Sequence, residues 1–315
     1  EIKGDQLIGV KDVNLMNSLS GKVAGVNINA SAAGIGGATR VVMRGSKSIT
    51  KDNNALYVID GVPIFNANKG GLNQNNEYAD QPRGEGISDL NPDDIESMSV
   101  LTGPAAAALY GSNAANGAIV ITTKKGATGK PKVTISNQTT FSRPFVMPDF
   151  QNKYGNKTGE YKSWGDVQNK YAYNPSDFFD TGATSQTSAT LSVGTDKNQT
   201  FMSLGSTKAN GIIPENDYMK YNATLRNTTK FLNDKMILDF GFSYIKQKDQ
   251  NMMAQGQYYN PLTAIYTYPR GEDFSYAKNY ELYSDALGYN VQQWKFGDQG
   301  LGMQNPYWKI GRAHV

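Results

Sequence analysis

From about residue 132 onward, apolar and polar residues alternate with a period of two, the pattern of β-strands that have one apolar face. The clearest case is the segment 236–246, in which the apolar positions are Leu238, Phe240, Phe242 and Tyr244. Between them lie Asp239, Gly241 and Ser243. Weaker versions of the same alternation run through residues 132–141, 186–194, 200–206 and 218–229. The pattern therefore predicts five strands, each with an apolar and a polar face.

The connections between these segments differ in length in a regular way. Residues 142–185 and everything after 249 form long connections, 195–199 and 232–235 form short ones, and 210–217 is intermediate. Alternating long and short connections are typical of outer-membrane barrels, whereas the period of two would equally suit a soluble β-sandwich. Because short connections favour neighbouring antiparallel pairs, we expect residues 186–194 to pair with residues 200–206 and the strand order to be sequential.

The first part of the chain mixes helical and strand patterns with glycine-rich turns. Helical spacing predicts helices over 13–19 and 104–110, and apolar runs predict strands over 23–27, 40–44, 55–60, 96–101 and 117–123. Asn91 before Pro92 predicts a capped helical turn, and Asp60-Gly61 predicts a hairpin turn. These short pieces predict a small α/β unit.

A polar Gly/Pro segment over residues 124–131 separates the two parts. We therefore divide the chain into residues 1–128 and 129–315. The start at Glu1, without a Met or a signal peptide, predicts that the N-terminus is not a natural one. The last six residues, 310–315, read IGRAHV, which a common sequencing adapter gives on translation, and we interpret them as an artefact.

Composition excludes several classes of function. The chain has 315 residues, a net charge of +3 and no cysteine, and its only histidine, His314, lies in the suspect tail. The longest apolar run, 105–110, is far shorter than the ~20 residues of a membrane-spanning helix, and the small net charge does not indicate nucleic-acid binding. We therefore predict no catalytic residues, no metal ligands, no cofactor and no enzymatic activity.

Several motifs occur in a fixed order in the first part. They are LSGKVAGV at 19–26, MRGS at 43–46, LYVIDGVPI at 56–64, LNPDDIES at 90–97, VL at 100–101, AAALYGS at 106–112 and ANG at 115–117. This series resembles the plug domain of SusC/RagA-type TonB-dependent outer-membrane transporters of Bacteroidetes, and the resemblance covers about residues 1–126. The later segments FFDTG at 178–182 and GIIPEN at 211–216 resemble the start of the family's barrel.

The resemblance implies an α/β plug domain followed by antiparallel transmembrane β-barrel strands, truncated so that the barrel is not closed. It implies a location in the cell outer membrane, in contact with lipid, and import of oligosaccharides or peptides. Its implied partners are a SusD-like lipoprotein and the TonB–ExbB–ExbD complex, which would contact a segment upstream of Glu1. The alternative is a soluble or surface-attached β-rich glycan-binding protein, which explains aromatic loops but neither the plug motifs nor the alternating connections.

Two groups of residues are candidates for contacts. Arg40 and Arg44 lie four residues apart, on the same face of a predicted strand, and could pair with barrel carboxylates to anchor the plug, or simply be solvated. The long connection after the first strand holds aromatic residues among polar ones, which could stack on substrate or touch the lipoprotein, or could pack on each other. These aromatic residues are Tyr154, Tyr161, Trp164, Tyr171 and Tyr173.

Two further features receive a purely structural interpretation. Asp93, Asp94 and Glu96 follow a helix cap, where carboxylates are favoured by the helix dipole, and we interpret them as solvated. The glycine-rich stretch at residues 34–37 lacks the spacing of a phosphate-binding loop, so we expect a flexible plug loop there.

Overall fold

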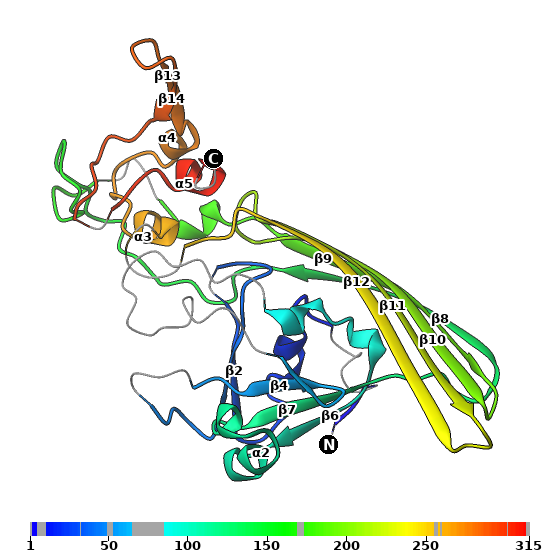
Figure 1. The fold of residues 1–315 in the computed structure, drawn as a ribbon. Coiled ribbons are helices and arrows are strands. Elements are labelled where there is room, and N and C mark those ends of the chain that lie inside the picture. The colour runs from blue at the N-terminus through cyan, green and yellow to red at the C-terminus, as the bar shows by residue number, and fades with distance from the viewer. Residues whose placement is uncertain are drawn as a thin grey trace.

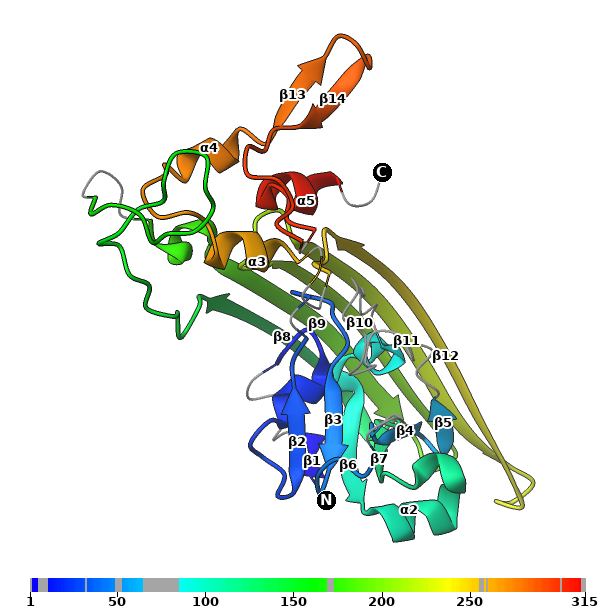
Figure 2. The ribbon, with the colours of Figure 1, turned by 90° about the vertical axis from the view of Figure 1, so that its left-hand side faces the viewer.

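The computed structural model describes residues 2–4, 11–31, 33–48, 53–64, 85–168, 173–254, 258, 260–300 and 302–312. An N-terminal α/β unit lies against one face of a sheet of long strands, and this sheet curves around it (Figures 1 and 2). A third group of short elements lies at the end of the long sheet that is remote from the N-terminus (Figure 1).

The N-terminal unit is built on a five-stranded sheet in the order β1-β6-β7-β4-β5. Its strands are β1 (Ile2–Lys3), β4 (Leu56–Ile59), β5 (Val62–Ile64), β6 (Ile95–Leu101) and β7 (Ala118–Thr123). The β4–β7 pair is parallel and the other pairs are antiparallel. A separate hairpin joins β2 (Val26–Asn29) to β3 (Arg40–Met43).

Short helices complete this unit. They are α2 (Gly103–Tyr110) and the 3-10 helices η1 (Leu15–Leu19), η2 (Gly86–Asp89), η3 (Pro92–Asp94) and η4 (Ser112–Ala114). The expected cap is confirmed, because the Asn91 side chain accepts a hydrogen bond from the Asp93 N–H. The expected helix over 13–19 is a short 3-10 helix that covers only Leu15–Leu19. It is nevertheless well anchored, because Leu15, Met16 and Leu19 are fully buried.

The unit is held together by a small apolar cluster around Val58 and Ala118 and by a larger apolar core. Large side chains from the sheet and from the short helices pack into it, including Tyr57, Ile87, Met98, Ile119 and Ile121. The predicted turn at Asp60-Gly61 is confirmed, with φ of 47° and 84°. Two positive φ values in succession are what the tight hairpin turn between β4 and β5 requires.

The long sheet contains five strands in sequential order, β12-β11-β10-β9-β8. They are β8 (Gly129–Ser142), β9 (Gly182–Gly194), β10 (Asn198–Asn210), β11 (Asp217–Phe231) and β12 (Met236–Gln250). The expected pairing of β9 with β10 is confirmed and extends from Gln199 opposite Gly194 to Asn210 opposite Ala183. Each strand has 13 to 15 residues, and ~9–11 residues suffice for a tilted strand to cross a bilayer.

The two faces of this sheet differ sharply in character. The face turned away from the N-terminal unit exposes apolar side chains, among them Val133, Ile135, Met202, Leu204, Leu238, Phe240 and Phe242. The opposite face carries mainly polar side chains, and those near the N-terminal unit are buried, among them Ser188, Ser203, Thr207, Lys220 and Asn222. β8 and β12 form the two edges of the described sheet and do not pair with each other, so the sheet is not a closed barrel.

No helix in the described ranges is both long and apolar enough to cross a membrane.

The third group of elements comes from two distant parts of the chain. They are η5 (Pro175–Phe178), α3 (Pro261–Tyr266), α4 (Ser275–Lys278), the hairpin β13 (Glu281–Ser284) with β14 (Tyr289–Gln292), and α5 (Pro306–Arg312). Their shared core is largely aromatic and includes Phe178, Tyr268 and Phe274. Ile310 is buried in this core, whereas residues 313–315, with His314, lie outside the described residues.

The expected division of the chain falls in a stretch without regular structure. β7 ends at Thr123, and β8 begins at Gly129. The division after residue 128, like the interpretation of residues 310–315 as an artefact, stays a prediction.

Candidate functional site

The N-terminal unit meets the long sheet through a buried cluster centred on Asp93. The Oδ2 atom of Asp93 accepts hydrogen bonds from Lys11 Nζ at 2.6 Å, from Ser136 Oγ at 3.1 Å and from Ser188 Oγ. The side chains of Lys11 and Asp93 are 3% and 9% exposed. A single carboxylate oxygen thus joins the N-terminal segment and η3 to β8 and β9. We call Lys11, Asp93, Ser136 and Ser188 the Asp93 cluster.

The two adjacent carboxylates of η3 have different surroundings. Burial opposes ionisation of Asp93, but the hydrogen bonds from Lys11, Ser188 and Ser136 and the Lys11 charge outweigh it and lower its pKa. Asp94 Oδ2 accepts a hydrogen bond from Ser203 Oγ at 2.8 Å. Burial raises the pKa of Asp94 from 3.8 to about 6 despite this bond. The interface therefore holds one carboxylate whose pKa is lowered, Asp93, and one whose pKa is raised to about 6, Asp94.

These positions overturn the interpretation of the acidic residues as solvated. Asp93 and Asp94 are only 6% and 4% exposed, and Glu96 alone is exposed as expected. The reason is tertiary, because η3 lies between the N-terminal unit and the long sheet. Its first turn faces serine residues of β8, β9 and β10 rather than water.

We expect the intact protein to be more stable at pH 5 than at pH 7.5, and Asp94→Asn to reduce this difference by about 1–1.5 kcal/mol. The raised pKa means that the folded protein holds this proton more tightly than the unfolded chain. The resulting stability is complete below about pH 3.8 and is lost as the pH rises through about 6. Urea unfolding at both pH values measures the effect. The exposed Glu96→Gln is the matched control, and an undiminished pH dependence in Asp94→Asn would contradict the prediction.

A second polar cluster joins the β4–β5 turn to β11 and β12. Arg226 Nη1 donates to Asp60 Oδ2 at 2.8 Å and to Thr123 Oγ1 at 2.5 Å. Its Nε and Nη2 atoms donate to the two carboxylate oxygens of Asp239 at 3.1 and 3.0 Å. Lys125 Nζ lies 3.1 Å from the same Asp239. The turn at Asp60 therefore also binds the sheet, and we call these five residues the Arg226 cluster.

Two further contacts join the unit to the long sheet near the start of β11. The buried Lys220 Nζ donates to the Ser88 carbonyl oxygen at 2.5 Å, and the Ile35 N–H donates to Asn216 Oδ1 at 3.0 Å. The second contact places the glycine-rich loop at 34–37 directly against the sheet. At Gly36, whose φ is 88°, an added Cβ would lie 2.8 Å from Tyr218 Cδ2. This close approach explains a glycine at that position.

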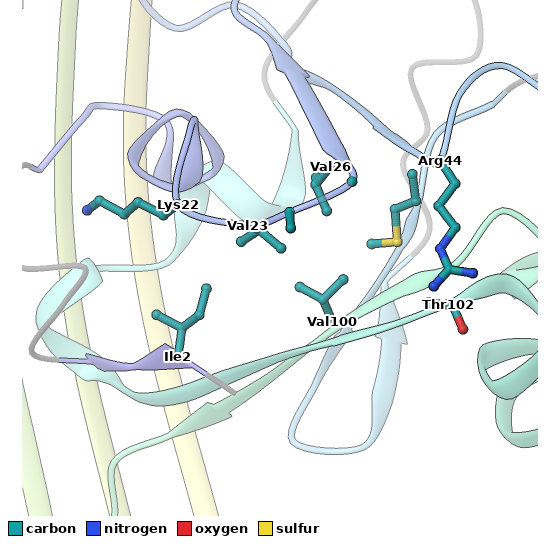
Figure 3. Close-up of a pocket in the computed structure, with 10 residues that line it drawn as sticks. Ile2, Lys22, Val23, Val26, Arg44, Val100 and Thr102 are labelled. Carbon is teal, nitrogen blue, oxygen red and sulfur yellow. The ribbon is translucent and has the colours of Figure 1, made fainter.

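The predicted anchors Arg40 and Arg44 lie elsewhere in the unit. β3 ends at Met43, and Arg44 has a φ of 55°, so the strand alternation that would place both arginines on one face does not continue to Arg44. Figure 3 shows the Arg44 side chain extending toward Thr102, at the rim of a cavity of about 410 Å³ within the N-terminal unit. Within the described ranges, the ion pairs that join the first part of the chain to the long sheet are Asp60–Arg226 and Lys125–Asp239. Anchoring by Arg40 or Arg44 stays a prediction.

The predicted aromatic contacts divide into two pairs. Tyr173 is 4% exposed and donates to the Ile265 carbonyl oxygen at 2.9 Å, and Tyr161 packs edge-on against Phe296. These two residues contribute to the packing of the third group of elements. Trp164 is 75% exposed, with Tyr154 beside it at a ring distance of 6.4 Å. Tyr171 lies outside the described residues. Contact of these aromatic residues with substrate or lipoprotein stays a prediction.

The residues that make the interface were not identified from the sequence. Lys220 and Arg226 carried a usable signal, because each is a charged side chain on the polar face of an alternating strand. Lys11 carried none, because nothing in its local sequence distinguishes it from a solvated lysine. In the described residues, no group of three or more His, Asp or Glu side chains is arranged to hold a metal ion.

Comparison with known proteins gives this interface its context. Residues 1–118 match the family model of the TonB-dependent receptor plug domain. The TonB-dependent receptor SusC of Bacteroides thetaiotaomicron is 27% identical over 97% of this chain and 30% of its own length. The TonB-dependent receptor P39 of Formosa agariphila is 28% identical over 71% of this chain and 21% of its own length.

A solved structure of the RagAB peptide importer in its closed-closed state superposes with a TM-score of 0.66 at 18% identity. The superposition covers 98% of this chain and 36% of the matched chain of the importer. The chain belongs to the SusC/RagA type of TonB-dependent receptors. The N-terminal unit of this receptor is its plug, and the long sheet is part of its barrel wall. The receptor is an outer-membrane protein.

The chain spans about 30% of the length of SusC and less of P39. Its curated relatives are receptors, which is consistent with the expectation that it is not an enzyme. The predicted fold class, a plug followed by antiparallel barrel strands that do not close, is confirmed.

Proposed function

We propose that this chain forms the plug and first barrel strands of a TonB-dependent transporter, and that the intact protein imports oligosaccharides or peptides. The observation that carries the proposal is the seating of the plug. It binds the polar face of a sheet of 13- to 15-residue strands, and the opposite face of that sheet is apolar. A polar inner face that is filled by a plug, together with an apolar outer face, suits a gated passage through lipid.

The position of the plug against the barrel wall also implies that transport needs a supply of energy. Five strands leave open edges that lipid does not tolerate, so further strands must complete the barrel wall. A plug fastened inside that wall by hydrogen bonds to Asp93 and by the ion pair between Asp60 and Arg226 blocks diffusion and must be pulled or rearranged. Because the outer membrane has no ATP, we infer that the energy arrives from the periplasmic side through the TonB–ExbB–ExbD complex, at a segment upstream of Glu1.

In this proposal, the end of the long sheet that carries the third group of elements faces the cell exterior. Features at this end favour a lipoprotein partner and either of two substrate classes. A SusD-like lipoprotein would cover the outer mouth, and likeness to SusC and to the RagAB peptide importer supports this assignment. The exposed Trp164 and its neighbour Tyr154 present aromatic faces at this end. Such faces suit sugar rings and peptide side chains alike, so either substrate class fits.

The intact protein should support growth on its substrate only with an energised inner membrane and an intact segment upstream of Glu1. Deleting that segment should abolish growth and leave binding of substrate at the cell surface intact, because the plug remains seated. Growth and surface binding of labelled substrate are measured side by side. An ionophore applied to undeleted cells is the control and should abolish uptake as the deletion does.

Survival of growth after the deletion would show a passive pore or a binding protein. It would favour the alternative, a surface-attached β-rich glycan-binding protein.

A further inference from the structure

Lys11 links the N-terminal segment to both the plug and the barrel wall. Its Nζ donates to Asp93 Oδ2 at 2.6 Å and to Ser136 Oγ at 2.9 Å, and its backbone N–H donates to Gln138 Oε1 at 3.2 Å. Asp93 belongs to η3 of the plug, whereas Ser136 and Gln138 belong to β8. Two of these three hydrogen bonds cross the interface to β8, and the third ties the N-terminal segment to η3 within the plug.

Few described contacts separate Lys11 from the N-terminus along the chain. β1 is paired at only two positions, Ile2 opposite Met98 and Lys3 opposite Ser97, and Ile2 also packs against the core of the unit. Lys11 makes the next described contacts along the chain. A displacement that begins at the N-terminus must open this two-residue ladder, and Lys11 is the next described residue of the segment that is bonded to the barrel wall.

We propose that Lys11 is a counter-ion latch, whose withdrawal with the N-terminal segment leaves Asp93 buried without its cation and releases the plug from the wall. The inference rests on the proposed function, in which the N-terminal segment transmits a pull. The latch converts a displacement of a few ångströms at one residue into loss of the contact between η3 and two barrel strands.

The physical reason is the asymmetry of a buried ion pair. Taking away one partner leaves the desolvation cost of the other uncompensated, which makes breaking such a pair strongly unfavourable. Ser136 and Ser188 supply only neutral donors to the remaining carboxylate. Asp94, equally buried beside it, adds like-charge repulsion. With Lys11 gone, the seat of η3 changes from a favourable contact into an unfavourable one.

The Arg226 cluster does not share this property. Its carboxylates Asp60 and Asp239 are 29% and 32% exposed, so water solvates them when the pair opens. No residue of that cluster lies in the N-terminal segment. A displacement of the N-terminal segment therefore acts directly on the Asp93 cluster. The Arg226 cluster opens only after the Asp93 cluster has been released.

The chain contains no cysteine, so a single introduced thiol reports on the seat of the plug. Thr207→Cys suits this purpose, because Thr207 is 7% exposed on the inner face of β10. In the intact protein in membranes, Lys11→Met should raise the rate of maleimide labelling at this position at least about tenfold. Lys11→Met combined with Asp93→Asn should label at nearly the parental rate, because position 93 then carries no charge that Lys11 has to balance. The exposed Lys22→Met, in the same unit, is the matched control and should not change the rate.

Labelling at the parental rate in Lys11→Met, or equally fast labelling in the double variant, would overturn the latch. A second measurement is single-molecule pulling from the N-terminus. The parental protein should show a rupture, after the one that opens β1, that Lys11→Met loses and Lys22→Met keeps. A rupture that persists in Lys11→Met would also overturn the proposal.

Neither readout needs substrate or TonB, so the two proposals fail separately. Energy-independent uptake together with Lys11-dependent labelling would refute the transport mechanism and support the latch. Energy-dependent uptake, together with a labelling rate that Lys11→Met does not change, would support the transport mechanism and refute the latch.

Discussion

Phe240→Arg in the intact receptor is expected to cost about 2–4 kcal/mol of folding free energy, and Ser243→Arg far less. Phe240 is 53% exposed in the apolar band of β12, where lipid surrounds it, so an arginine there must enter hydrocarbon. Ser243 lies on the opposite face of the same strand, which is polar and turned toward the plug. Urea titration of the refolded protein in bilayers, and the amount recovered in the outer membrane, measure the difference.

The two variants form a matched pair, because the same side chain is introduced into one strand at positions three residues apart. Equal tolerance of both would mean that the apolar band faces water. That result would favour the soluble β-rich alternative and would mean that β8–β12 do not cross a membrane.

Arg226→Met should cost about 2–3 kcal/mol and loosen the plug at the β4–β5 turn. The variant removes charge-assisted hydrogen bonds to two carboxylates, and such bonds contribute ~1.5–3 kcal/mol each, reduced here because both carboxylates are partly solvated. It also leaves Asp60 and Asp239 close together without the guanidinium between them. Urea unfolding of the intact protein gives the change in free energy.

Lys125→Met is the control within the same cluster. Its side chain is 46% exposed and, among the described residues, forms an ion pair with Asp239 alone, so we expect a cost below about 1 kcal/mol. A double-mutant cycle with Asp60→Asn isolates the contact between plug and wall. A coupling energy near zero between Asp60 and Arg226 would show that this ion pair does not fasten the plug.

Much of the barrel wall follows from the sequence alone. Side chains of a strand alternate strictly between two faces, so the parity of Leu238, Phe240 and Phe242 against Asp239 assigns every residue of β12 to a side. Short and intermediate connections make neighbours pair, which accounts for the order of β9 to β12, whereas β8 reaches its place beside β9 through a long connection. The turn at Asp60-Gly61 and the cap at Asn91 were equally accessible, because both are determined within a few residues of backbone.

The interface could not be read in this way. Asp93 and Asp94 have the local signature of solvated helix-cap residues, and only the packing of η3 against β8, β9 and β10 buries them. Arg226 reaches Asp60 across 166 positions of sequence, and Lys11 lies 82 positions from Asp93.

The sequence by itself determined which face of each barrel strand is polar and which segments are strands, because those properties depend on neighbours two to four residues apart. The tertiary structure alone decided which polar residues of the wall meet the plug. That choice depends on how two separately patterned units dock, and the burial that makes Lys11 and Asp93 matter exists only after they have docked.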